Sequence, residues 1–561
     1  PVAMGCGSSV RKQSKVHSAV EQVKDLDFTG EADLVSLPPE KIRQLAEQVL
    51  HGSKTNLVDL FTKLFYLLVV VNVKSRKVNY KSVEDIGQPL PPKKLSYWHP
   101  DGIPCCRMPV DDEDWDPRLL EKVFGNIGLD ALLALVKQLP NEDKPIWFDS
   151  LAEGAMTFQL EFASLMPTPH ETFEELRSDE AMELIAFWGA GQAYLRGNEK
   201  GWEIDLNSLG DYPVRPGYEK YGARAYFNEH RKLQSIYCRY SEKEVRPDCD
   251  DWEHAKWVWR VSLGFSLTGG VHFAQIHWIA SNCVHIACRE HLGEEHPVRK
   301  VLKVFLFNTG GINYAALSKL YPEDSFLQRS LAFTYEGMVG FLRDAVEGFK
   351  YETHPQFIAA RNLGSASQDL PLVADGLLVW DALHSFFEGY VGLFYEDDAA
   401  VESDHELVAY WDCIDSRGGA SQTVRYGLPK LCRSALVDQL THHAFVVTAW
   451  HEFVHGIAHY VSVPDGFGTK IRPGRNESDV QSFVQGLCLV GLTGMRMPPL
   501  LSDWRFLLPQ EPPEARDLQV RLMEDLRRVS AEVEGRNASA PCPSRRRKVE
   551  SFNPKHFECS V

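Results

Sequence analysis

Two long apolar stretches limit what this chain can fold into. They run from Trp252 to Leu320 and from Leu377 to Tyr460, and both follow a helical pattern of apolar residues. Neither shows the alternation of strand and helix that is typical of a parallel sheet, and no internal repeat is present. The sequence therefore predicts a mainly α-helical fold, in which one large domain fills most of the 561 residues.

The rest of the chain divides less clearly. Residues 1–35 are polar and predict a flexible tail, which leaves residues 36–561 for the helical domain. Apolar spacing and flanking prolines predict helices at 40–50 and 116–139. Residues 200–250 are rich in glycine, proline and tyrosine, so we expect irregular structure there.

Charge and cysteine content exclude several classes of protein. The net charge of −17 argues against nucleic-acid binding, which needs clustered lysine and arginine. The 12 cysteines have no regular spacing, which favours reduced thiols and a cytoplasmic location. The longest apolar run, Leu64 to Val71, is far shorter than the roughly 20 residues that cross a bilayer.

The N-terminal segment carries a candidate lipid anchor. If translation begins at Met4, Gly5 opens a myristoylation motif and Cys6 offers a site for palmitoylation. The basic residues that follow and could contact anionic lipid are Arg11, Lys12 and Lys15. Two such signals are enough for stable anchoring, so this interpretation predicts attachment to the cytoplasmic face of a membrane. The alternative is a glycine- and serine-rich segment without this function.

The second apolar stretch contains the motif HExxH, at His451 to His455. Two histidines one helical turn apart lie on the same face of a helix and can bind one metal ion. In zinc proteases the glutamate of this motif, here Glu452, acts as general base. The motif alone therefore predicts either a zinc protease or half of a larger metal site.

A second histidine pair, His272 and His277, lies in the first apolar stretch. A spacing of five is poor for a regular helix, but an i→i+5 bulge brings the two side chains together. Neutral imidazole is a common ligand of zinc and iron, so two pairs on two helices could supply four ligands. The alternative is that these histidines are hydrogen-bonded residues of the core.

Around these histidines the chain resembles the lipoxygenases. Glu295 to Leu302 resembles the family's HPxxKLL segment, and Gly311 to Ala316 resembles its INxxA stretch. Further matching segments are Asp375 to Ala382 (DGLLxWEA), Asp404 to Trp411 (DPELQAWW), Gly427 to Lys430 and Glu534 to Asn537 (ExRN). The resemblance is continuous from about Tyr212 to the end of the chain. It implies a single large helical domain with minor β structure, which holds a metal between long central helices.

The resemblance also implies a set of metal ligands. His272, His277 and His451 take the positions of three family histidines, and His455 takes a position where the family uses Asn, His or Ser. The fifth ligand in the family is the C-terminal carboxylate, here that of Val561. Imidazole with one carboxylate suits non-haem iron and leaves an open position. Manganese would fit the same ligands.

The implied activity is oxygenation of polyunsaturated fatty acids. In the family, iron(III) hydroxide removes a hydrogen from a bis-allylic carbon, and O₂ adds to the radical to give a conjugated hydroperoxide. Ala316 falls at the small-residue position linked to stereochemistry, and Leu320 and Leu327 fall where the family lines its fatty-acid channel. The implied partners are thus a polyunsaturated fatty acid, O₂ and, through acylation, a membrane surface.

Several residues depart from the family pattern. A competing alignment makes His277 and Asn282 the ligands in place of His272 and His277. Glu452 and His459 are unusual near the third histidine, and Ala458 stands where the family has a glutamine beside the site. The chain also shows no sequence like the N-terminal β-sandwich that many members carry.

These departures leave two alternatives to an active dioxygenase. The first is a lipoxygenase-like protein that binds lipid without catalysis, because changes around metal ligands cost about 10–100-fold in affinity or activity. The second is a zinc metalloprotease built on HExxH, for which the sequence offers no other protease motif. Metal content and the position of the Val561 carboxylate would separate these alternatives.

Overall fold

The structure is a computed structural model, and it is mainly helical over the residues that it describes. It describes residues 97–98, 107–109, 176–307, 309–323, 325–364, 369–420, 424–456, 460, 466–479, 482, 498–539 and 552–561. The predicted tail, the acylation motif and the predicted helices at 40–50 and 116–139 lie outside these residues. The prediction of a mainly α fold is confirmed for the described part.

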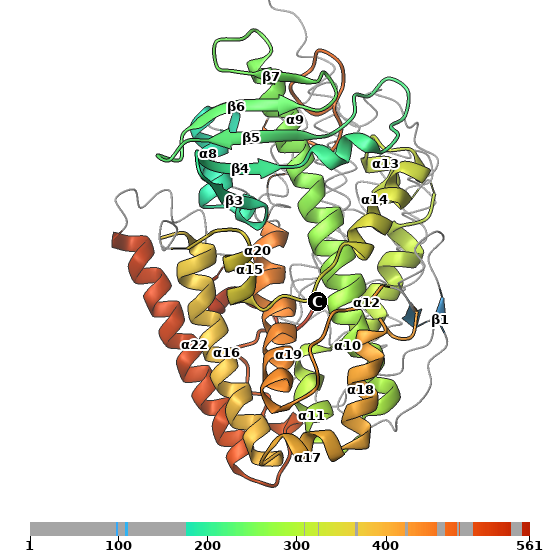
Figure 1. Ribbon diagram of the computed structural model, residues 1–561, viewed down its shortest axis with the longest axis vertical. Coiled ribbons are helices and arrows are strands. Elements are labelled where there is room, and N and C mark those ends of the chain that lie inside the picture. Colours follow the sequence, from blue (N-terminus) through green and yellow to red (C-terminus); the bar gives the residue numbers. More distant parts are fainter. Residues whose placement is uncertain are drawn as a thin grey trace, which may run out of the picture.

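The first apolar stretch begins with one continuous helical rod, from Trp252 to His291. It consists of α9 (Trp252–Phe265), the π-helix η5 (Ser266–Ser281) and α10 (Asn282–His291). The backbone stays helical at both junctions, and nearly all of η5 is buried. A helix that is apolar on every side belongs in the centre of a domain, as this rod does in Figure 1.

The later part of the second apolar stretch forms a second helical rod, which runs antiparallel to the first in Figure 1. It consists of α19 (Arg433–Phe445), the short π-helix η8 (Val446–Trp450) and α20 (His451–His455). Both η8 and α20 pack directly on η5. The two central rods therefore meet at η5, which carries His272 and His277, and at α20, which carries His451 and His455.

Further helices cover these rods. α16 (Pro371–Phe394) packs between α19 and the long outer helix α22 (Glu514–Ser539), as Figure 1 shows. The other helices of the described part are α8 (Asp179–Phe187), α11 (Pro297–Phe305), α12 (Thr309–Ala315), α13 (Phe326–Ser330), α14 (Tyr335–Glu347), α15 (His354–Ala360), α17 (Asp398–Ser403) and α18 (His405–Asp415). Most begin at a side chain that accepts a backbone N–H, such as Thr334 before α14 and Asp404 before α18.

Long-range polar contacts join segments that the resemblance had treated separately. Asp375 of α16, which is 1% exposed, accepts a hydrogen bond from Arg536 of α22 at 2.8 Å. His296, which caps α11, lies 3.1 Å from the Asp404 carboxylate that caps α18. Two pairs of sequence motifs thus meet in space, and their polar residues hold the covering helices in register.

The prediction of irregular structure at residues 200–250 is wrong. This region holds most of a five-stranded antiparallel sheet, with the strand order β3 (Leu195–Asn198), β4 (Gly201–Asp205), β5 (Ala223–Phe227), β6 (Leu233–Cys238) and β7 (Lys243–Val245). Burial alternates along β4 and β5, as expected for strands with one face on the core. Each strand is only a few residues long, so its period is easily missed among the turn residues. A separate pair, β1 (Tyr97–Trp98) and β2 (Met108–Pro109), lies apart from this sheet.

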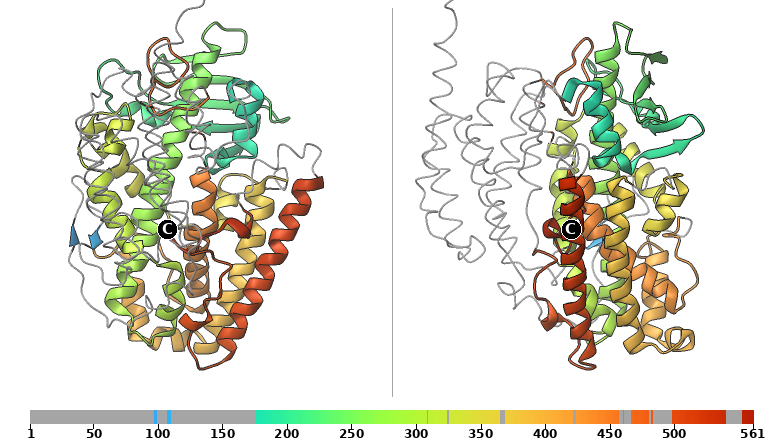
Figure 2. Two further views of the ribbon diagram at one scale, coloured as in Figure 1. Left: turned by 180° about the vertical axis from the view of Figure 1, so that it is seen from behind. Right: turned by 90° about the vertical axis from the view of Figure 1, so that its left-hand side faces the viewer.

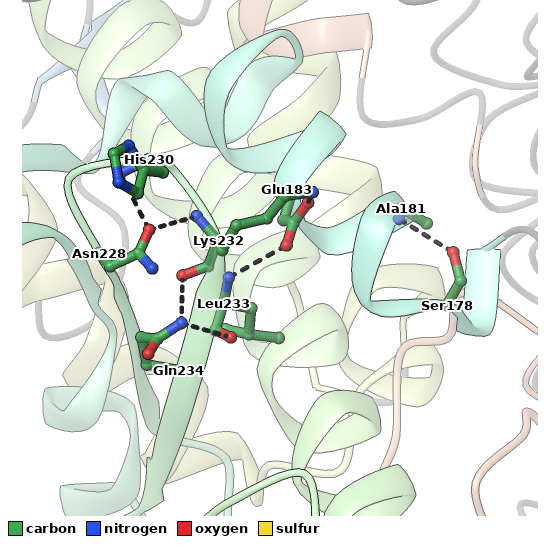
Figure 3. Close-up of polar contacts among 8 residues, drawn as sticks. All are labelled: Ser178, Ala181, Glu183, Asn228, His230, Lys232, Leu233 and Gln234. Atoms are coloured by element: carbon green, nitrogen blue, oxygen red, sulfur yellow. Dashed lines mark hydrogen bonds and ion pairs between the residues drawn. The ribbon is translucent and has the colours of Figure 1, made fainter.

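Hydrogen bonds fix the sheet to α8. Figure 3 shows the turn between β5 and β6, where the Asn228 side chain accepts from the backbone N–H groups of His230 and Lys232. Glu183 of α8 accepts from the Leu233 N–H at 3.1 Å and pairs with the Lys232 ammonium at 2.7 Å. Figure 2 shows the sheet at one end of the helical body, away from α11 and α17.

The sequence also led to expectations about the cysteines and about membrane-spanning segments. The cysteines of the described part carry free thiols, in line with the expected reduced state. Among the helices that the structure describes, none is long and apolar enough to cross a membrane.

Candidate metal centre

Three of the four predicted histidines converge where the two central rods cross. The ring nitrogens that His272, His277 and His451 offer lie within 4.8 Å of one another. The closest pair is Nε2 of His272 and Nε2 of His451, 2.8 Å apart. His272 and His277 are buried, and His451, the first residue of α20, is half-buried. The group therefore lies mainly inside the protein.

The π-helical geometry of η5 explains the five-residue spacing of the first pair. A π-helix widens the turn, so residues five apart point in nearly the same direction. The ring centroids of His272 and His277 lie 4.9 Å apart with the rings nearly perpendicular, at 85°. The predicted i→i+5 bulge is confirmed, and η5 extends it over sixteen residues.

His455 lies next to this group without belonging to it. Its ring is stacked parallel to that of His451, one turn earlier in α20, at a centroid distance of 5.7 Å and an angle of 3°. Its centroid is 5.1 Å from that of His272. Among the described residues, the convergent set holds His272, His277 and His451 alone, so His455 would need a side-chain rotation to become a fourth ligand.

Asn313 of α12 orients the second histidine. Its Oδ1 lies 2.8 Å from Nδ1 of His277, and its Nδ2 donates to the His277 carbonyl oxygen at 2.8 Å. The Nδ1–H of the ring therefore donates to the amide oxygen, which leaves Nε2 unprotonated for a metal. Asn313 is fully buried. It stands in the INxxA stretch, but the sequence alone assigned it no role because its partner is 36 positions away.

Burial keeps these rings neutral. Burial lowers the pKa of His277 to about 4, against a smaller upward effect of the hydrogen bond to Asn313. The pKa of His272 lies well below its usual value because of burial and then of the neighbouring rings of His451, His277 and His455. Neutral imidazoles present lone pairs, which is the form that binds a metal.

The donor set fits a divalent or trivalent transition metal. Two nitrogens bound at about 2.1 Å and at right angles around one ion lie about 3.0 Å apart. The 2.8 Å between Nε2 of His272 and Nε2 of His451 is close to that value. Imidazole ligands suit iron, zinc and copper.

Val561 is buried in the helical core, with 3% of its surface exposed. The preceding Ser560 donates from Oγ to the Phe307 carbonyl oxygen at 2.6 Å, and Cys559 donates its N–H to the carbonyl oxygen of Pro498. Figure 1 marks this end of the chain near the centre of the view. The role of its carboxylate as a ligand stays a prediction.

The predicted substrate residues lie on one segment that packs beside η5. Ala316 and Leu320 are the first and last residues of the short π-helix η6, and both are partly buried against the core. Leu327 of α13 is buried. Tyr321, which follows η6, contacts Trp278 of η5 at a ring-centroid distance of 5.4 Å. Ala316 also follows Asn313 by less than one turn, so the segment begins beside the metal centre.

The competing alignment would make Asn282 a ligand in place of His272. Asn282 begins α10, and its side-chain amide donates to the backbone oxygen of Arg107. His272, by contrast, points at His451. Glu452 is half-buried on α20, next to His451 in the sequence, and Ala458 and His459 lie outside the described residues.

Comparisons with known proteins point to one family. The family model described as Lipoxygenase matches residues 239–462. Lipoxygenase 7, chloroplastic, of Oryza sativa subsp. japonica is 28% identical over 220 residues, which is 36% of this chain and 24% of that protein. Linoleate 9/13-lipoxygenase of Pseudomonas aeruginosa is 29% identical over 208 residues, 36% of this chain and 30% of that protein.

Solved structures show the same fold. An anaerobic crystal structure of a LOX variant in complex with arachidonate superimposes with a TM-score of 0.67 at 14% sequence identity, over 88% of this chain and 80% of that one. At this identity the likeness concerns the fold alone. The chain spans less than a third of the length of the two curated relatives, and the matched region contains all four predicted histidines.

Proposed function

Because the chain is related to the lipoxygenases, we propose that it is an iron dioxygenase that inserts O₂ into polyunsaturated fatty acids and forms a conjugated hydroperoxide. The single observation that carries this proposal is the 2.8 Å approach of His272 to His451, residues that are 179 positions apart. Two helical rods meet there through a buried and a half-buried imidazole. A structural hydrogen bond needs one such pair, whereas His277 supplies a third nitrogen within 4.8 Å.

In this proposal the histidines hold the ion and its surroundings prepare it. Iron, when bound, supplies the one-electron oxidation that removes a hydrogen from a bis-allylic carbon. His272, His277 and His451 would hold it, and Asn313 keeps the His277 ring in the tautomer that can bind a metal. Val561 is the candidate for a carboxylate ligand, and His455 for a further imidazole.

The apolar surroundings would hold the substrate and exclude water from the radical. η5 is buried along almost its whole length, and the segment that contains Ala316, Leu320 and Leu327 packs beside it. An acyl chain binds through apolar contacts with few polar groups to set its direction. The fold is shared with a lipoxygenase structure that contains arachidonate, which supports a fatty acid as the substrate class.

The zinc-protease alternative gains little from the geometry. A zinc protease of this type would use His451, Glu452 and His455. It would give no role to His272, whose ring lies against His451. Lipid binding without catalysis would keep the fold but lack turnover. Manganese at the same ligands would support the same reaction.

A pair of matched variants tests the proposal. Iron-loaded protein is incubated with linoleate or arachidonate, and the conjugated diene is followed by absorbance. We expect diene formation, its loss in His451→Ala with loss of iron, and little change in Glu452→Gln, which keeps the size and polarity of its side chain. Full iron occupancy without diene formation from either lipid would reject the dioxygenase and favour the lipid-binding alternative. Zinc content with peptidase activity that depends on Glu452 would favour the protease.

A further inference from the structure

A second group of metal-binding side chains lies at the far end of the first central rod. Glu290 and His291 are the last two residues of α10, and Cys413 is in the last turn of α18. The ligand atoms that these three residues offer lie within 4.8 Å of one another. Thirteen residues of helix separate Glu290 from His277, about 20 Å along the rod, so this group is distinct from the histidine cluster.

Two of the three side chains are largely buried, and the third is partly exposed to solvent. Cys413 is buried with 8% of its surface exposed, and the side chain of Glu290 is 11% exposed. His291 is open on one side, with 33% of its side chain exposed. An ion could therefore enter past the imidazole and reach the Cys413 thiol and the Glu290 carboxylate inside.

The two oxygens of Glu290 face different groups. Oε1 lies 4.0 Å from the Arg107 guanidinium, and Oε2 lies 4.0 Å from Nε2 of His291. Arg107 also donates a hydrogen bond to the carbonyl oxygen of Gly418, which follows α18 in the chain. Arg107 can thus hold the carboxylate by one oxygen while the other stays on the side of His291. Outer groups that fix a ligand in this way are a regular part of metal sites.

We propose that Glu290, His291 and Cys413 form a second metal site, separate from the histidine cluster, that takes Zn²⁺ or a similar thiophilic divalent ion. One thiolate, one imidazole and one carboxylate are a ligand set that zinc accepts, with water in the fourth position. Ligand atoms around tetrahedral zinc lie about 3.3–3.7 Å apart, so small side-chain rotations would close the present separations. On binding, the thiol proton of Cys413 passes to water and a sulfur–metal bond forms.

The site lies between two helices, so a bound ion would link them. α10 continues from η5, which carries His272 and His277, and it packs along α18. An ion bound between the two helices would fix the end of the rod that holds the first histidine pair. A cation is also favoured there because Glu290 and His291 lie in the last turn of α10, where the helix dipole is negative.

Cobalt spectroscopy on the iron-loaded protein tests this site without a measurement of activity. Co²⁺ bound to a thiolate gives a charge-transfer band, and the histidine cluster contains no sulfur. We expect the band in the unaltered protein, its loss in Cys413→Ser and its persistence in Cys249→Ser, which removes an exposed thiol elsewhere. Competition by Zn²⁺ should remove the band with a stoichiometry of one ion per chain.

A second variant separates a built site from a simple thiol adduct. His291→Gln alters a partly exposed residue and should not disturb folding, which circular dichroism checks. We expect it to weaken Co²⁺ and Zn²⁺ binding at this site at least about tenfold, the loss that even outer changes around a metal produce. Absence of the band in the unaltered protein, its survival in Cys413→Ser, or unchanged affinity in His291→Gln would each overturn the proposal.

Discussion

Replacing Asn313 by alanine tests how the predicted metal centre is organised. The variant removes the acceptor 2.8 Å from Nδ1 of His277 and the donor to the His277 carbonyl oxygen. Both contacts are buried, so water cannot replace them. An unsatisfied buried donor costs about 1–3 kcal/mol, and we expect the metal-free protein to lose about 2–3 kcal/mol of stability.

The effect on the metal is separate from the effect on stability. Without Asn313 the His277 ring can rotate and exchange its tautomers, so Nε2 is no longer held toward His272 and His451. Changes of this kind weaken metal binding about 10–100-fold, which corresponds to about 1.4–2.7 kcal/mol. Asn313→Asp keeps an oxygen for Nδ1–H and should restore most of the iron affinity, although it loses the donor to the carbonyl oxygen.

Competition with a chelator measures iron affinity, and thermal melting of the metal-free protein measures stability. Gln439→Ala is the matched control, because Gln439 is a fully buried amide on α19 that accepts from the Tyr410 hydroxyl at 3.1 Å. We expect this control to lose stability and keep its iron affinity. If Asn313→Ala binds iron as tightly as the unaltered protein, or if Gln439→Ala weakens iron equally, the proposed role of Asn313 is wrong.

Three further variants test the fold. Arg536→Ala should lower the free energy of unfolding by about 2 kcal/mol, because the buried Asp375 carboxylate loses the hydrogen bond that Arg536 donates. A denaturant titration measures this loss, and a change below about 0.5 kcal/mol would contradict the prediction. Gly337→Ala should destabilise by about 1–3 kcal/mol in the same titration, since the added methyl group would lie 2.3 Å from a backbone carbonyl oxygen that cannot move aside; an unchanged midpoint would show that α14 shifts freely. His254 gains a hydrogen bond to Glu219 that raises its pKa above the usual 6.5, so its contribution is full below about pH 6.5 and is lost as pH rises through the folded value. Melting temperature against pH should show that loss, and His254→Gln should remove it; equal pH profiles would refute the role of this contact.

The helical parts of the fold were predictable from local pattern. The apolar stretches extend over many turns, so their period is well defined, and each histidine pair falls on one rod. The i→i+5 spacing of His272 and His277 was enough to predict a π-helical bulge, because no regular helix brings such residues together. Local sequence thus predicted the helical rods and the histidines that each rod carries.

The sheet and the polar contacts between distant segments were not predictable in the same way. Strands of three to six residues give too few repeats to show a period, and the glycines and tyrosines among them resemble loops. The pairing of Asn313 with His277 and of Asp375 with Arg536 depends on tertiary packing, which local pattern does not encode. The second metal site has the same origin, since Cys413 joins Glu290 only through the packing of α18 on α10.

Oxygen-isotope labelling tests the central claim most directly. Iron-loaded protein is incubated with linoleate under ¹⁸O₂ in ordinary water, and the product is examined by mass spectrometry. A dioxygenase at the His272, His277 and His451 cluster predicts a hydroperoxide in which both oxygen atoms are labelled, and no labelled product from His451→Ala. Unlabelled or singly labelled product, or the same labelled product from His451→Ala, would contradict the assignment of dioxygenase chemistry to this cluster.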